Sequence, residues 1–96
     1  MTGFILSPAA QADVEHIWDY TADRWGLDQA ERYVRDIGDA CQELASGSRQ
    51  SRAVDIREGY RKALVGSHLL FFKSDDEGQI VIVRILHQKM DTNRHL

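Results

Sequence analysis

The sequence contains few residues that could cross-link the chain, with one cysteine, Cys41, among 96 residues. A single cysteine cannot form a disulfide within the chain, so packing has to hold the fold together. Cys41 falls in the apolar register of an expected helix, which favours a small buried side chain over a reactive thiol. With 43% hydrophobic content, the chain can build one compact domain over residues 1–96.

Long apolar runs are also missing. No stretch approaches the ~18 apolar residues that cross a bilayer, and the N-terminus has no basic segment followed by an apolar one, as a secretory signal would. We therefore expect a cytoplasmic protein with no membrane partner.

Familiar catalytic motifs are absent: there is no phosphate loop, zinc ribbon, G-x-S-x-G elbow or paired-carboxylate cleft. The nearest metal-ligand spacing is His87, Asp91 and His95, which would align only on a helix. The stretch from Asp91 to Asn93 is a poor helical sequence. We therefore expect no metal site and no cofactor.

Charge is unevenly distributed along the chain. Residues 1–48 hold nine Asp/Glu and three Lys/Arg, net −6, whereas residues 49–96 hold six Asp/Glu and nine Lys/Arg, net +3. This separation suggests that the two halves face different partners, although the solvated faces of an ordinary domain would look the same.

The first half predicts a short strand and two helices. Side-chain alternation favours a strand from Met1 to Ser7, and apolar residues at helical spacing favour helices over about residues 8–25 and 28–46. Ser7 and Pro8 are typical of a helix start. The helices should pack as an antiparallel hairpin. The expected apolar stripes are Ala10, Val14, Ile17, Trp18, Thr21 and Trp25, and Ala30, Tyr33, Val34, Ile37, Cys41 and Leu44.

The ends of the second helix carry their own signals. Asp28 with Glu31 fits a capping box at its start, and Gly47 fits its end. Gly26 supplies the stop of the first helix.

The second half, after a polar connector over residues 46–55, predicts a three-stranded antiparallel meander at about residues 60–65, 68–74 and 79–87. Gly66-Ser67 fits a two-residue primed turn between the first two strands. The third strand is apolar on both faces apart from Arg84, which favours a central position. The predicted fold is α+β, with the helical hairpin packed on one face of the sheet.

Basic residues gather on or beside the expected sheet. Metal-free RNA cleavage would need a base, an acid and cations at the phosphate. His87, Arg61, Arg84 and Tyr60 could fill these roles. The alternative is that these residues are solvated, with Arg84 paired to a carboxylate. The basic set is Arg57, Arg61, Lys62, Lys73, Arg84, His87, Lys89 and Arg94.

Five stretches, taken in order, resemble the ParE toxins of bacterial toxin–antitoxin modules, within the RelE/ParE superfamily. The resemblance covers about Phe4 to Leu96 and agrees with the strand, hairpin and meander derived above. The stretches are IWDYTADRWG (17–26), QAERY (29–33), IREGYRK (56–62), GSHLLFFK (66–73) and VRILHQKMD (83–91).

The resemblance implies a toxin that binds DNA gyrase, blocks replication and stabilises cleaved DNA without hydrolysing anything itself. It implies no sequence-specific nucleic acid binding by the toxin alone. It also implies a ParD-like antitoxin whose flexible C-terminal segment wraps the toxin in a hetero-oligomer, of which a heterotetramer is one form.

The RelE branch of the superfamily instead cuts messenger RNA on the ribosome. Its members typically carry two lysines on the second strand and an arginine early in the third, with a tyrosine or histidine near the C-terminus. The corresponding positions here are Arg61, Ala63 and His68, with His87 nearest the end. Each preorganised charge at a phosphate is worth about a hundredfold or more in rate, so Ala63 argues against efficient cleavage. A non-toxic domain kept for antitoxin binding is the third hypothesis.

Two surfaces follow as hypotheses. The apolar groove of the helical hairpin, near Trp18, Trp25, Leu27 and Tyr33, is expected to receive the antitoxin, whose strand could also add to an open sheet edge. The clustered charge beside the sheet is expected to form the toxic surface that contacts gyrase. Its residues are Arg57, Arg61, Arg84, His87, Lys89, Met90, Arg94 and His95.

Overall fold

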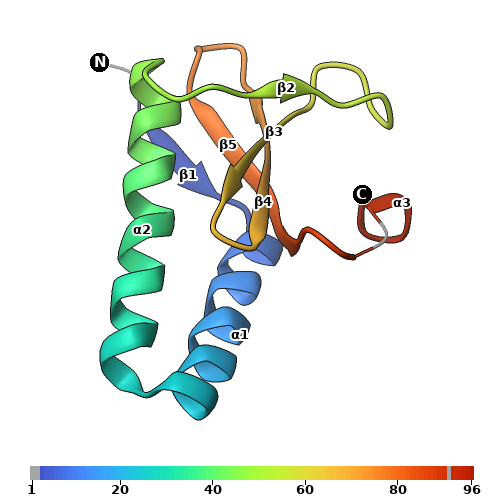
Figure 1. Cartoon of the computed structure of the whole chain (residues 1–96). Helices are drawn as coiled ribbons and strands as arrows, with labels where there is room; N and C mark the ends of the chain where they lie inside the picture. The colour runs from blue at the N-terminus through green and yellow to red at the C-terminus, as the bar shows by residue number, and fades with distance from the viewer. Residues whose placement is uncertain (1–2, 91) are drawn as a thin grey trace.

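A computed structural model describes residues 3–90 and 92–96 as a two-layer α+β fold, which confirms the predicted fold class (Figure 1). Two long helices form one layer, and a five-stranded sheet forms the other. The elements in chain order are β1 (Phe4–Leu6), α1 (Pro8–Trp25), α2 (Leu27–Ser46), β2 (Arg52–Ala53), β3 (Arg61–Val65), β4 (His68–Ser74), β5 (Ile80–His87) and α3 (Thr92–His95).

The two long helices meet at a single residue, Gly26, whose φ of 93° suits glycine. The predicted start of α1 is confirmed, since Pro8 is its first residue. The capping box predicted from Asp28 and Glu31 is wrong. Because α2 already begins at Leu27, Asp28 lies inside the first turn, and no side chain caps this end. Its carboxylate can still favour the helix by facing the positive end of the helix dipole.

The sheet has the order β1-β5-β4-β3-β2, so the predicted central position of the last long strand is confirmed. β1 runs parallel to β5, pairing Phe4–Leu6 with Ile80–Ile82, and the other neighbours are antiparallel. The two-residue strand β2 lies inside the polar connector, where no strand was predicted. It pairs with the start of β3, where Arg52 faces Lys62.

The main core lies between the helices and one face of the sheet, and a β-bulge in β5 shapes it. Arg84 pairs with Phe71, whereas Ile82 pairs with Phe72, so β5 carries one extra residue at this point. Side chains normally alternate between faces. The bulge allows Ile82 and Ile85, three residues apart, to be buried in the same cluster.

The expected stripe of α1 needs correction. The buried residues are Ala10, Asp13, Ile17 and Thr21. Trp18 is only half-buried, and Trp25 is 71% exposed. Trp25 ends α1 at the tip of the hairpin, which extends beyond the sheet in Figure 1. No strand is available there to cover it.

The C-terminus forms one helical turn, α3, where the sequence predicted none. The Leu96 N–H donates to the Thr92 carbonyl at 3.0 Å, and the His95 carbonyl accepts a hydrogen bond from Arg84 at 3.4 Å. Asp91, the middle residue of the considered metal triad, lies outside the described residues. The remaining His, Cys, Asp and Glu side chains of residues 3–90 and 92–96 form no group of three that could hold a metal. No helix within these ranges is long and apolar enough to cross a membrane.

The turn between β3 and β4 brings Gly66 against Tyr33 of α2. Gly66 has a φ of 55° and Ser67 does not have a positive φ, which fits the predicted primed turn in its II′ form. A Cβ added at Gly66 would lie 2.6 Å from Tyr33 Cε1 and 2.8 Å from its Oη. Glycine is therefore favoured at position 66 for two reasons: the positive φ and the lack of space for a Cβ beside Tyr33.

We expect Gly66→Ala to lower the free energy of unfolding by about 2–3 kcal/mol, because it adds a steric clash to the strain of a positive φ. Gly78→Ala is the matched control: its φ is 81°, but a Cβ there would meet nothing within 4 Å. Denaturant unfolding of both variants measures the difference. Equal losses would show that Tyr33 moves aside without cost.

Candidate functional site

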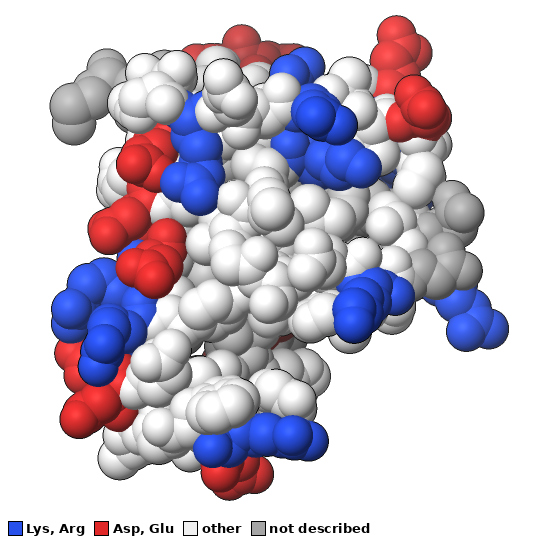
Figure 2. Space-filling view, in the orientation of Figure 1, with Lys and Arg blue, Asp and Glu red and all other residues white. Residues whose placement is uncertain are grey.

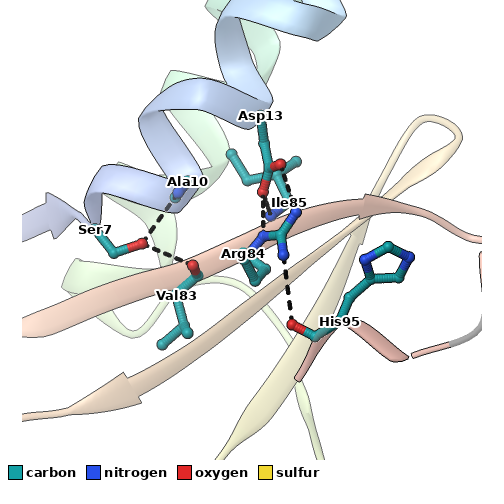
Figure 3. A network of polar contacts seen from close by, with 7 residues as sticks. All are labelled: Ser7, Ala10, Asp13, Val83, Arg84, Ile85 and His95. Carbon is teal, nitrogen blue, oxygen red and sulfur yellow. Dashed lines mark hydrogen bonds and ion pairs between the residues drawn. The ribbon is translucent and has the colours of Figure 1, made fainter. Parts of the chain in front are cut away.

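A partly buried ion pair joins α1 to β5 (Figure 3). Arg84 Nε donates to Asp13 Oδ2 and Arg84 Nη2 donates to Asp13 Oδ1, both at 2.8 Å. Asp13 Oδ2 also accepts the Ile85 N–H at 2.9 Å. The hydrogen bonds to Asp13 raise the pKa of Arg84 above its ordinary value. The arginine expected to contact gyrase therefore has a partner within the fold, as the alternative interpretation of Arg84 held.

Ser7, the residue before α1, is hydrogen-bonded to the bulged part of β5. Ser7 Oγ accepts the Ala10 N–H at 3.0 Å and donates to the Val83 carbonyl at 2.7 Å. The Ser7 N–H donates to the Ile82 carbonyl at 2.9 Å. One serine therefore caps the helix and satisfies carbonyls of the irregular part of β5.

The C-terminal turn is tied to the same guanidinium. Arg84 Nη1 donates to the His95 carbonyl at 3.4 Å (Figure 3). Lys89 and Met90 lie exposed just beyond β5, and Arg94 and His95 lie exposed on α3. Four residues of the expected toxic surface are thus exposed on the two sides of residue 91, and Arg84 contacts the backbone of one of them, His95.

Two other residues of that set lie at the start of β3 and in the connection before it, Arg61 as the first residue of β3 and Arg57 in the connection. Arg61 Nε donates to Ser51 Oγ at 2.8 Å, and Nη2 donates to the Ser51 carbonyl at 2.9 Å. The Arg57 guanidinium lies 5.8 Å from the Tyr60 ring centroid. In Figure 1 this connection and α3 are both drawn on the right of the view. Six residues of the expected set therefore come from these two parts of the chain, and the other two, Arg84 and His87, lie in β5.

A polar cluster links α2 to the sheet beside the β3–β4 turn. Tyr33 Oη lies 2.6 Å from His68 Nδ1 and accepts the Ser67 N–H at 3.1 Å. The His68 and His87 rings are arranged edge to face, with 5.3 Å between their centroids. Burial lowers the pKa of His68, and the neighbouring His87 lowers it further. The Tyr33 hydroxyl therefore bonds to the sheet side of the molecule, and the residue does not line the groove between the two long helices.

A groove of about 430 Å³ lies between the two long helices. Half-buried Val14, Trp18 and Val34 supply its apolar lining, and Glu15 and Asp19 supply its charge. Trp25 and Leu27 lie at the hairpin tip on either side of Gly26, 71% and 68% exposed. Of the four residues expected to bind the antitoxin, the structure thus places only Trp18 in the groove.

With this geometry in place, comparison with known proteins decides the family. Residues 4–92 match the family described as the ParE toxin of the type II toxin–antitoxin system, parDE. The chain belongs to the ParE toxin family. A curated relative, "Toxin ParE1" of Mycobacterium tuberculosis, is 54% identical over 94 residues, spanning 97% of this chain and 96% of the relative.

Solved structures confirm the ParE-type fold. A chain described as the chromosomal ParDE TA system from P. aeruginosa superimposes with a TM-score of 0.78 at 22% identity, over 91% of this chain and 96% of that one. A chain of the toxin–antitoxin complex RelBE2 from Mycobacterium tuberculosis gives 0.67 at 19% identity, over 93% of each. ParDE and RelBE proteins therefore share this architecture, and the fold alone does not separate their activities.

Asp13 is the residue that sequence reasoning missed. It was counted only among the acidic residues of the first half, yet it sits three positions after Ala10 and four before Ile17. This spacing places it on the buried face of α1. A carboxylate on an apolar helical face requires a cationic partner. The lone arginine of the apolar β5 run was the available signal.

We expect Asp13→Ala to lower the free energy of unfolding by about 1–3 kcal/mol, because it leaves the partly buried Arg84 and the buried Ile85 N–H without their partner. The exposed Arg35–Glu31 pair provides the control, since its side chains are 62% and 61% exposed. Arg35→Ala should cost about 0.5 kcal/mol or less. Urea unfolding measures both variants, and similar small losses in the two would mean that the Asp13 pair is not structural.

Proposed function

We propose that this ParE-family toxin poisons DNA gyrase by binding, blocks replication in the cytoplasm and is held inactive by a ParD-like antitoxin. The observation that carries the proposal is the match to the ParE family over residues 4–92, together with 54% identity to a protein named Toxin ParE1. Gyrase as the target rests on the resemblance to ParE toxins.

The positions that a RelE-like nuclease would use favour this proposal over RNA cleavage. Ala63 is 4% exposed in the main core, so it supplies no cation. Arg61 is held by Ser51. His68 Nδ1 is engaged by Tyr33, and burial disfavours the charged ring. His68 stands where RelE-like nucleases carry an arginine, and a neutral ring there would supply no fixed positive charge for the phosphate.

The exposed C-terminal segment suits a contact surface. Lys89, Arg94 and His95 project as donors, and Met90, 48% exposed, adds an adaptable apolar side chain. Arg84 Nη1 donates to the His95 carbonyl at 3.4 Å, which connects α3 to β5 and leaves the side chains of Arg94 and His95 exposed.

Inducing the toxin without its antitoxin should stop DNA synthesis within minutes while translation continues. Pulse-labelling of both in cells that express the chain from a tightly repressed promoter measures the order of events. The Lys89→Ala/Arg94→Ala double variant should slow the loss of DNA labelling, whereas Asp76→Ala, an exposed change in the β4–β5 loop, should not.

Either alternative has its own signature in this assay. Translation stopping first would replace gyrase poisoning with RelE-like cleavage. No effect on either, with the protein folded and abundant, would indicate a non-toxic domain kept for antitoxin binding.

Trp18→Ser should weaken binding of the cognate antitoxin by roughly tenfold, because it removes the largest apolar side chain of the hairpin groove. Tyr20→Ser is the matched control, an exposed aromatic of the same helix outside that groove. Titration calorimetry with the purified antitoxin measures both. Equal affinities for Trp18→Ser and the wild type would place the antitoxin elsewhere.

A further inference from the structure

A second groove lies over the edge of the sheet where β2 ends, and its volume of about 930 Å³ is more than a single ion needs. It shares no lining residue with the hairpin groove or with the expected toxic surface. Figure 2 shows Lys and Arg gathered at the end of this face where Figure 1 draws β2, above a neutral area over β3 and β4. The lining residues are Glu43, Ser48, Arg49, Gln50, Ser51, Arg52, Lys62, Ala63, Leu64, Leu69 and Gln88.

The groove holds two cations that the fold does not use. Arg52 and Lys62 are direct partners on neighbouring antiparallel strands, where like charges oppose each other at a cost. None of the ion pairs found within residues 3–90 and 92–96 involves either of them. Arg49, by contrast, pairs with Glu43 and donates to the Leu64 carbonyl at 3.0 Å. An anion placed between Arg52 and Lys62 would relieve their repulsion.

The apolar residues of the groove indicate which kind of anionic ligand would fit it. Leu64 is 53% exposed and faces half-buried Leu69 on the neighbouring strand, so apolar surface lies beside the cations. A bare phosphate would leave this surface unused. Aromatic residues, on which the bases of a single-stranded nucleic acid would stack, are absent from the lining. A ligand with carboxylates beside an apolar side chain would match both the two cations and the apolar surface of the groove.

The free edge of β3 is not fully available for pairing with an added strand. The Leu64 carbonyl, which an incoming strand would need, is already bonded to Arg49. Recognition here therefore runs through side chains, with Ser48, Gln50, Ser51 and Gln88 available as further hydrogen-bonding groups.

From these observations we propose that the groove between Arg52, Lys62 and Leu64 docks an acidic segment of a partner protein in which carboxylates flank an apolar residue. The guanidinium and ammonium groups would bind the carboxylates, and Leu64 with Leu69 would cover the apolar side chain.

Fluorescence anisotropy with the purified chain tests the proposal, using a short labelled peptide in which glutamate and leucine alternate. This peptide should bind, and its counterpart of lysine and leucine should not. Arg52→Glu with Lys62→Glu should weaken binding by about tenfold or more, and Leu64→Ser by a few-fold. Lys73→Glu, an exposed change outside the groove, should alter affinity less than about twofold.

A loss of peptide binding in the single variant Arg52→Glu would not be explained by a loss of folding. Its carboxylate would face Lys62, replacing a like-charge pair with an attractive one, so thermal stability should hold or rise while binding falls. Three results would overturn the proposal. They are no binding at millimolar peptide, an equal loss in Lys73→Glu, and an oligothymidylate of the same charge that displaces the peptide and binds more tightly.

Discussion

The contact on which the rest of the structure depends is the ion pair between Asp13 and Arg84. Asp13 is buried and Arg84 is partly buried, and a bidentate contact together with the Ile85 N–H offsets the cost of removing the carboxylate from water. The pair sits at the bulge of β5, where an extra residue would otherwise leave backbone groups without partners. Ser7 completes the arrangement by satisfying two carbonyls of the same stretch. The first turns of α1 and the bulge of β5 therefore supply each other's hydrogen-bond partners.

This arrangement places the C-terminal segment as well as the core. The bulge lets Ile82 and Ile85 face the helices together, while the Arg84 guanidinium reaches the His95 carbonyl. One side chain thus connects α1, the central strand and the turn that carries Arg94 and His95. In the proposed function, the surface that contacts gyrase is held by a residue that does not itself have to touch it.

The sequence predicts the elements well because their signals are local. Ser7-Pro8 marks the start of α1, Gly66-Ser67 marks the turn between β3 and β4, and the doubly apolar run of β5 indicates its central position. The parallel pairing of three-residue β1 and the two-residue strand β2 depend on partners far along the chain, which no local pattern reveals.

The candidate sites were less predictable because helical spacing alone does not say which flank is covered. Val14, Trp18 and Trp25 share a period with the buried residues of α1, yet Asp13 rather than a tryptophan lies against the sheet. Tyr33 was assigned to a partner surface, but its hydroxyl bonds within the fold to His68 and Ser67. Both outcomes follow from polar groups that find partners only in the tertiary structure.

Several features of this chain stabilise nothing within it. Arg52 opposes Lys62, and Trp25 and Leu27 lie in water, although a domain of this size has little stability to spare. The two grooves also differ in charge, since Glu15 and Asp19 line one and Arg52 and Lys62 line the other. A single wrapping partner that filled both would have to change sign along its length. A partner with the reversed order of charges would meet like charge at both grooves and bind less tightly.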